Sequence, residues 1–277
     1  MKNLFSYEGK RCLITGCFSG MGEATARIVQ SLGGEVVPVD IKKPTTFPFE
    51  KFYEVDLKDP VAIEQMVADV ASGGPIDRLF YCAGLPNTFD RLDIMLVNFV
   101  GLRHTVETAV PHMPRDAAAA SISSAGGMGY LGQMQNILPF LATQGFAEGK
   151  KWLEEHLDDG WIDGYASSKM CTIVYTLQRG PTLTTETGVR LNCISPGPTD
   201  TPMMPAFVEA TSQEFMDNYP KPVGRNSTPE EQGWPMVFLN SDAASYISGE
   251  NLYTDGGTAG GLMTGSVKLD IPAGMGD

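Results

Sequence analysis

The chain has 277 residues, enough to bury a large core, and its even composition predicts a single domain over residues 1–277. It carries 20 Lys and Arg against 33 Asp and Glu, a formal charge of −13 that argues against nucleic acid and acidic membrane surfaces as partners. The 5 cysteines and 3 scattered histidines, with no segment near the roughly 18 apolar residues of a membrane span, predict a cytoplasmic protein with reduced thiols and no metal site.

Short apolar runs alternate with helical patterns along the chain. Residues 11–15 predict a strand, followed by a glycine-rich turn and a helix that ends at Gly33-Gly34. A second strand is expected at 35–40, although Pro38 is unusual inside a strand. Further strands are expected at 52–56, 76–82, 118–123, 189–194 and 250–254, and further helices at about 60–70, at about 90–110 and from Tyr165 onward.

This alternation predicts an α/β fold, a Rossmann-type doubly wound parallel sheet of about seven strands with helices on both faces. The turn from Thr15 to Gly22 lies between the first strand and helix, where glycines let the backbone approach a pyrophosphate. Asp40 ends the second strand, where a carboxylate accepts hydrogen bonds from an adenosine ribose and repels a 2′-phosphate. This favours NAD over NADP, although Lys42 and Lys43 are near enough to receive a phosphate.

Two later strand ends also suit a cofactor. Asp56 follows the third strand, where it would either meet the adenine edge or cap the helix that begins near Pro60. The small residues of Cys82-Ala83-Gly84 end the fourth strand and would let a cofactor pass close to the backbone, although alone they predict only a turn.

Tyr165 and Lys169 are four residues apart and share one face of the predicted helix. A free phenol titrates near pH 10, and an ammonium nearby lowers that pKa, so the tyrosine becomes a workable general acid and base. Since chance also supplies this spacing, its weight depends on the rest of the chain.

Taken in order, the motifs resemble those of the short-chain dehydrogenase/reductases over nearly the whole chain. The matching elements are Thr15-Gly16-x-x-x-Gly20-x-Gly22, Ala83-Gly84, Asn98, Ile122-Ser123-Ser124, Tyr165-x-x-x-Lys169, Pro196-Gly197 and Asp255-Gly256-Gly257. The resemblance implies a catalytic group of Asn98, Ser124, Tyr165 and Lys169, with Ser123 as the alternative serine.

In that resemblance, Tyr165 passes a proton to or from the substrate oxygen, which Ser124 hydrogen-bonds. Lys169 lowers the pKa of the tyrosine and holds the nicotinamide ribose. Asn98 would bind a water in a proton relay with Lys169, or else bond to backbone as an ordinary helix residue. In the segment after the sixth expected strand, Thr199 and Thr201 would hold the nicotinamide amide.

The expected cofactor-binding residues are therefore Gly16, Phe18, Ser19, Gly20, Met21, Asp40, Asp56, Leu57, Cys82, Ala83, Gly84, Tyr165, Lys169, Pro196, Gly197, Thr199 and Thr201. The expected substrate contacts are Ser124, Met128, Tyr130, Tyr165 and Met203, with Phe18 and Trp161 as further candidates. A substrate lid is expected at about 203–221, whose apolar residues would otherwise be helix core.

Ser124 and Tyr165 are 41 residues apart, more than the family usually shows. Residues 128–164 therefore contain an apolar, partly helical insertion, which would either wall a pocket for a bulky substrate or cover the helix faces through which the family commonly forms tetramers. The insertion, with Cys82-Ala83-Gly84 and 188–192, resembles the bacterial 3α-hydroxysteroid dehydrogenase/carbonyl reductase branch.

The resemblance implies an NAD-dependent enzyme, a homodimer or homotetramer, that interconverts a hydrophobic secondary alcohol and its ketone on a steroid-like or aromatic skeleton. One alternative is reduction of a carrier-bound 3-oxoacyl group, against which the acidic charge and Asp40 argue. The other is a non-catalytic NAD-binding protein, against which the presence of all four catalytic residues argues.

Overall fold

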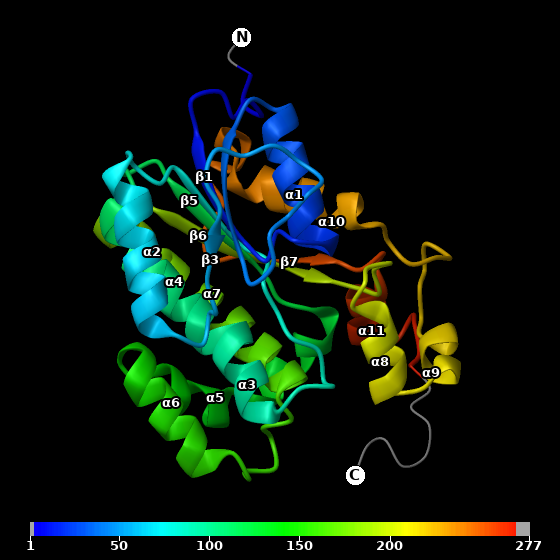
Figure 1. The fold of residues 1–277 in the computed structure, drawn as a ribbon. Helices are drawn as coiled ribbons and strands as arrows, with labels where there is room; N and C mark the ends of the chain where they lie inside the picture. Colours follow the sequence, from blue (N-terminus) through cyan, green and yellow to red (C-terminus); the bar gives the residue numbers. More distant parts are fainter. Residues whose placement is uncertain (1–2, 270–277) are drawn as a thin grey trace.

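The structure is a computed structural model, and it describes residues 3–269. Seven parallel strands form one sheet in the order β3-β2-β1-β4-β5-β6-β7, which confirms the predicted doubly wound fold (Figure 1). The strands are β1 (Arg11–Thr15), β2 (Glu35–Asp40), β3 (Tyr53–Glu54), β4 (Arg78–Tyr81), β5 (Ala118–Ile122), β6 (Arg190–Pro196) and β7 (Asn251–Thr254).

Helices cover both faces of the sheet (Figure 1). On one face lie α1 (Gly20–Ser31) and α10 (Pro229–Asn240), and on the other lie α2 (Pro60–Ser72), α4 (Leu102–Ala109) and α7 (Tyr165–Thr187). The other helices are α3 (Arg91–Met95), the π-helical η1 (Leu96–Gly101), the 3₁₀ turns η2 (Val110–His112), η3 (Ala125–Gln133) and η4 (Asp242–Ala244), α5 (Met134–Leu141), α6 (Gly145–His156), α8 (Met204–Ala210), α9 (Gln213–Asn218) and α11 (Thr258–Thr264).

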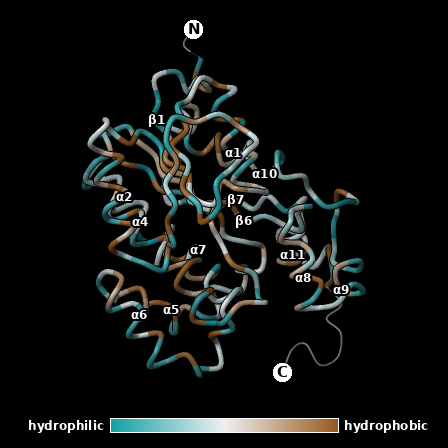
Figure 2. The backbone as a smooth tube through the Cα atoms, in the orientation of Figure 1, coloured by the Kyte–Doolittle hydropathy of each residue, from teal (hydrophilic) through white to brown (hydrophobic). Residues whose placement is uncertain are grey.

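The strands are apolar because each is buried on both faces. In β1, Leu13 points toward the core under α2, α4 and α7, whereas its neighbour Ile14 points toward the core under α1 and α10. The hydrophobic segments of Figure 2 accordingly gather at the centre of the molecule. All 5 cysteines are free thiols, and 4 of them are buried in these cores and loops.

Two expected elements differ in extent from the sequence pattern. The strand expected at 52–56 pairs only at Tyr53 and Glu54, and it binds the far side of β2 at Val39 and Asp40. Pro38 therefore lies before that ladder begins, where its missing N–H leaves no gap in the pairing. The helix expected at 90–110 is divided into α3, η1 and α4 by six π-helical residues. Among the described residues, no helix is long and apolar enough to cross a membrane.

The apolar segment between β5 and α7 folds onto the outer side of the helices. Helix α5 packs on α7, and α6 packs on α4 and η1. The rings of Phe140, Trp152 and His156 stack in a row, with centroids 4.8 and 4.0 Å apart. The buried Arg103 of α4 donates to the carbonyls of Thr143 and Gly145, which ties the loop between α5 and α6 to the body. Helices α5 and α6 thus cover helix faces.

Candidate active site

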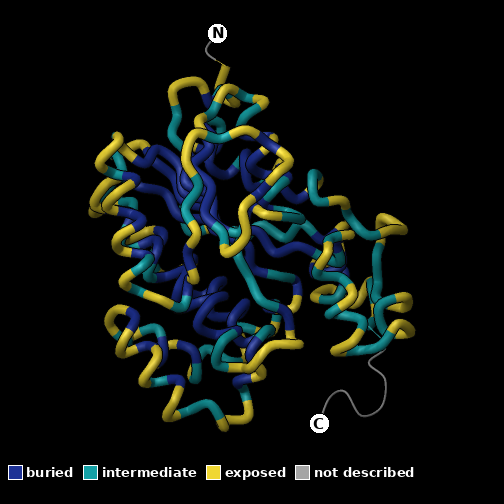
Figure 3. The backbone as a smooth tube through the Cα atoms, in the orientation of Figure 1, coloured by how far each residue is buried: buried dark blue, intermediate teal, exposed yellow. Residues whose placement is uncertain are grey.

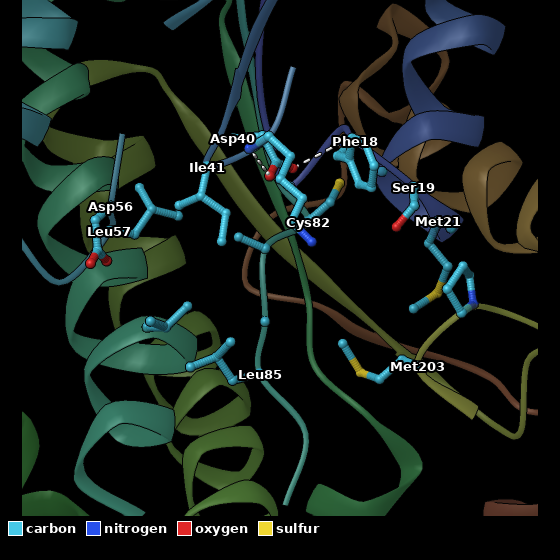
Figure 4. Close-up of a pocket in the computed structure, with 18 of the residues that line it drawn as sticks. Phe18, Ser19, Met21, Asp40, Ile41, Asp56, Leu57, Cys82, Leu85 and Met203 are labelled. Atoms are coloured by element: carbon cyan, nitrogen blue, oxygen red, sulfur yellow. Dashed lines mark hydrogen bonds between the residues drawn. The ribbon is translucent and has the colours of Figure 1, made fainter. Parts of the chain in front are cut away.

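Strands β1 and β4 are neighbours, and the chain continues from them toward opposite edges of the sheet. In such sheets ligands bind at this reversal, outside the carboxyl ends of the strands. A pocket of about 380 Å³ lies there (Figure 4). The expected cofactor residues that line it are Gly16, Phe18, Ser19, Gly20, Met21, Asp40, Asp56, Leu57, Cys82, Ala83, Gly84 and Thr201.

The loop after β1 meets the end of β4 backbone to backbone. Gly16 has a φ of 71°, and a β-carbon there would lie 2.4 Å from the nitrogen of Ala83. A β-carbon on Gly22 would lie 2.0 Å from the carbonyl oxygen of Gly16. Only glycine fits either position. The first turn of α1 is therefore held at the pocket with its free N–H groups, an arrangement that suits a dinucleotide pyrophosphate.

Asp40 is fixed at the end of β2 by the glycine loop. One carboxylate oxygen accepts from the Phe18 N–H at 2.9 Å, and the other accepts from the Lys42 N–H at 3.1 Å (Figure 4). The ammonium of Lys42 lies 5.6 Å from the centre of the Phe18 ring. The two hydrogen bonds therefore fix the orientation of the Asp40 carboxylate in the pocket, while the Lys42 ammonium lies against the Phe18 ring.

Asp56 lines the pocket close to the end of β2, and its expected contact with the adenine edge stays a prediction. The alternative role as cap of α2 is wrong, because Asp59 caps that helix by accepting from the N–H groups of Val61 and Ala62. Gly22 of the glycine motif and Lys42, named above as a possible phosphate contact, also line the pocket. The sequence did not indicate the remaining lining residues, which are Ile41, Val55, Lys58, Leu85, Phe89, Asp93, Val97 and Pro202.

The segment after β6 reaches the pocket through Thr201, Pro202 and Met203. The expected residues Pro196, Gly197 and Thr199 are not among those that line it, and Gly197 borders a second pocket with Pro198 and Asp255. The hydroxyl of Thr199 donates to the Gly197 carbonyl and pairs with Ser227, so the side chain holds the loop together.

Ser124 and Tyr165 come together at the start of α7. Both border Gly126, where a β-carbon would lie 3.4 Å from the Ser124 hydroxyl oxygen and 3.8 Å from a carbon of the Tyr165 ring. The Ser124 oxygen accepts from the Gly126 N–H at 3.0 Å. The neighbouring Ser123 is buried and donates to the carbonyl of Lys169 at 2.8 Å. Of the two serines, Ser124 is therefore the one that lies beside the Tyr165 ring, and its catalytic role stays a prediction.

The electrostatics of Tyr165 and Lys169 differ from the expectation. Burial raises the pKa of Tyr165 to about 12, and the Ser124 hydrogen bond only partly opposes it. Burial also lowers the pKa of Lys169 to about 8. The ammonium lies 5.5 Å from the centre of the tyrosine ring and donates to the Ile122 carbonyl at 2.8 Å. The net shift of the Tyr165 pKa is therefore upward, opposite to the expected direction, because burial disfavours the charged phenolate.

Asn98 lies in η1, and both its amide oxygen and its amide nitrogen bond to protein groups. Its amide oxygen accepts from the Leu85 N–H at 2.7 Å, and its amide nitrogen donates to the Leu85 carbonyl at 3.0 Å and to Ser168 at 3.2 Å. Ser168 in turn donates to the Tyr165 carbonyl at 2.6 Å. Of the two expected roles, the structure shows the backbone-bonded one, through which Asn98 connects the end of β4 to the first turn of α7.

The expected substrate contacts divide between two places. Met203 lines the pocket, whereas Met128 and Tyr130 lie in η3, which packs on α7. Trp161 packs in the insertion, 6.3 Å from the Trp152 ring. Phe207, an apolar residue of the segment expected to be a lid but not among the expected substrate contacts, places its ring 5.0 Å from the Tyr165 ring.

Comparisons with known proteins agree with this geometry. The short chain dehydrogenase family model matches residues 10–135, and a model described as Enoyl-(Acyl carrier protein) reductase matches residues 163–259. Residues 136–162, between the two, hold α6 and most of α5. The chain is 29% identical over 250 residues to a coniferyl-alcohol dehydrogenase from Pseudomonas sp. (strain HR199), which covers 90% of this chain and 96% of that protein.

It is also 30% identical over 255 residues to a 3-alpha-hydroxysteroid dehydrogenase/carbonyl reductase from Comamonas testosteroni, covering 88% of this chain and 95% of that one. The structure is similar to that of a 3-alpha-hydroxysteroid dehydrogenase from Pseudomonas sp. B-0831 complexed with NADH, with a TM-score of 0.75, 26% identity and coverage of 94% and 100%. The chain belongs to the short-chain dehydrogenase/reductase family. It is an oxidoreductase of a family that binds a nicotinamide cofactor.

The glycine packing predicts a sharp mutational effect. Gly22→Ala puts a methyl group against the Gly16 carbonyl, so we expect NADH affinity to fall at least about tenfold and the melting temperature to fall by several degrees. NADH fluorescence titration and thermal unfolding measure the two effects. Gly132→Ala is the control, since a β-carbon there has nothing within 4 Å, and it should change neither. Unchanged NADH affinity in Gly22→Ala would contradict the proposal that this glycine loop holds the pyrophosphate.

The buried lysine predicts a pH-dependent stability. Lysine titrates at 10.5 in the unfolded reference and at about 8 in the fold, so between these values the unfolded chain binds more protons and stability rises with pH. Lys169→Met lacks this contribution. The free energy of unfolding of wild type minus variant should therefore increase by about 2 kcal/mol from pH 7 to pH 10 in urea titrations. A difference independent of pH would show that Lys169 is not desolvated.

Proposed function

We propose that this oxidoreductase is an NAD-dependent dehydrogenase that interconverts a hydrophobic secondary alcohol and its ketone. The observation that carries the proposal is the placement of Ser124 beside Tyr165, with the Lys169 ammonium 5.5 Å from the centre of the tyrosine ring, in a sheet whose strand ends also hold the glycine loop and Asp40. The relatives named for coniferyl alcohol and 3-alpha-hydroxysteroid support substrates with an apolar skeleton and a hydroxyl or carbonyl group.

In ketone reduction, Tyr165 donates its phenol proton to the carbonyl oxygen, and Ser124 donates a hydrogen bond to the same oxygen as negative charge develops there. In alcohol oxidation, the phenolate accepts the hydroxyl proton. Because the pKa of Tyr165 is raised to about 12, the protonated form needed for reduction predominates at neutral pH. Alcohol oxidation should accordingly gain from rising pH.

Other side chains and backbone groups would bind the cofactor and position Tyr165. Asp40 would accept hydrogen bonds from the adenosine ribose, and the first turn of α1 would hold the pyrophosphate. Lys169 would donate to the nicotinamide ribose, and Asn98 keeps Tyr165 in place through Ser168. When bound, the nicotinamide supplies or accepts the hydride that the reaction requires.

The NADH in the similar Pseudomonas structure supports NAD as the cofactor, together with the fixed carboxylate of Asp40. A second candidate is reduction of a carrier-bound acyl group, which the description of the model matching residues 163–259 favours. The net charge of −13 argues against it, because an acidic carrier protein would be repelled. A non-catalytic role is not supported, since the proton-transfer groups are present and in contact.

Tyr165→Phe removes the proton carrier while keeping the ring. We expect turnover of secondary alcohols with NAD to fall by about 10³-fold, with NADH affinity nearly unchanged. Initial rates followed at the NADH absorbance and fluorescence titration give the two quantities. Tyr246→Phe makes the same change at a fully exposed tyrosine and should retain wild-type rates. Substantial turnover in Tyr165→Phe would sink the proposed role.

Asp40→Asn removes the charge that would repel a 2′-phosphate and keeps an acceptor oxygen for the ribose. The ratio of kcat/KM with NAD to kcat/KM with NADP should fall at least about tenfold, roughly 1.4 kcal/mol. Lys42→Met is the companion variant, because loss of NADP use on that change would show that Lys42 receives the phosphate. A wild-type preference for NADP would contradict the NAD assignment.

A further inference from the structure

The segment expected to be a substrate lid, residues 203–221, holds α8 and α9. Both helices lie wholly within the described residues, and neither contains a buried residue. In Figure 3 this region shows only intermediate and exposed segments, unlike the sheet and the helices around it. The lid nevertheless carries the half-buried apolar side chains of Phe207 and Phe215. Because these two helices bury no side chain of their own, we expect their apolar side chains to pack on a bound ligand or on the active site.

Phe207 contacts the ring of Tyr165, the proposed proton-transfer residue. Its ring stands at 75° to the ring of Tyr165, with centroids 5.0 Å apart, which is the edge-to-face arrangement that aromatic pairs prefer. The other aromatic pair of the lid, Phe215 with Tyr219, lies within the lid and the loop that follows it, 6.0 Å apart. Phe207 is therefore the lid aromatic that contacts the proton-transfer group.

A substrate must pass close to this ring. Its oxygen has to meet both the Ser124 and the Tyr165 hydroxyls, so the carbon skeleton bonded to that oxygen lies alongside the tyrosine, within reach of the lid. Met203, at the start of the lid, lines the neighbouring pocket and supplies a further apolar surface. The side chain that borders the reacting carbon from the lid is thus an aromatic ring rather than a polar group or an aliphatic chain.

We propose that Phe207 is a specificity-determining residue, and that it recognises a flat aromatic ring attached to the carbon that bears the reacting oxygen. The inference deepens the proposed function and rests on it, since it selects aryl alcohols and ketones from the broader class of apolar ones. A substrate ring takes up the edge-to-face contact that Phe207 makes with Tyr165 in the structure described here, and the lid closes over it.

The size of the effect follows from the chemistry of the pair. Aromatic contacts contribute about 0.5–1.5 kcal/mol beyond the area they bury, or roughly two- to tenfold in affinity. A saturated ring of nearly the same size buries similar area without that contribution. Phenyl and cyclohexyl ketones are therefore a matched pair of probes, and Phe207→Leu is the matched change in the protein, because leucine keeps an apolar side chain without a ring.

The test is calorimetric binding of acetophenone and cyclohexyl methyl ketone to the protein with NADH bound. Wild type should bind acetophenone about fivefold more tightly, and Phe207→Leu should bind the two ketones equally, with NADH affinity unchanged. Phe215→Leu makes the same substitution in the second lid helix and should keep the wild-type preference, which separates recognition by Phe207 from a general loosening of the lid.

The inference is overturned if wild type shows no preference, if it binds neither ketone, or if Phe207→Leu retains the preference. Turnover of 1-phenylethanol and 1-cyclohexylethanol with NAD is measured alongside. Because binding does not require turnover, a lost preference in Phe207→Leu without any turnover would count against the proposed dehydrogenase and still support the ring contact. Turnover by Phe207→Leu with the wild-type preference for the phenyl ketone would support the proposed dehydrogenase and count against the ring contact.

Discussion

The site depends on the close backbone contact between the loop after β1 and the end of β4. Where Gly16 lies against Ala83 and Gly22 against Gly16, no side chain fits, and the two strand ends approach as closely as the backbone allows. That contact aims the first turn of α1 at the pocket and brings the Phe18 N–H to Asp40. The position of the charge that meets the adenosine ribose in the proposed function follows from the same packing.

The second half of the site is built on desolvation. Tyr165 and Lys169 lie in α7, and Ser124 lies just after β5. Burial shifts both titrating groups toward their neutral forms, raising the pKa of the tyrosine and lowering that of the lysine. The hydrogen bonds from Asn98 to Ser168 and from Ser168 to the Tyr165 carbonyl hold the first turn of α7 in position. The burial of Tyr165 and Lys169 sets their protonation states. Helices α5 and α6 of the insertion pack on the outside of α4, η1 and α7.

The sequence predicted what depends on local pattern. Alternating strands and helices gave the sheet, and the glycine spacing and Asp40 gave most of the cofactor pocket, since strand ends converge in a parallel sheet. It could not predict what depends on tertiary surroundings. The direction of the Tyr165 pKa shift is set by burial, and the contact of Tyr165 with Phe207 joins residues 42 positions apart through a lid with no motif. The choice between Asp56 and Asp59 as the cap of α2 likewise required the local geometry.

The central claim is that a secondary alcohol passes its hydride to NAD at this site. The most direct measurement uses 1-phenylethanol carrying deuterium on the carbinol carbon, with NAD and the purified protein, and determines the mass of the NADH formed. The proposed chemistry predicts NADH that carries the deuterium, because the hydride leaves that carbon as the hydroxyl proton passes to Tyr165. NADH without the label, or no NADH from this and related alcohols, would contradict it.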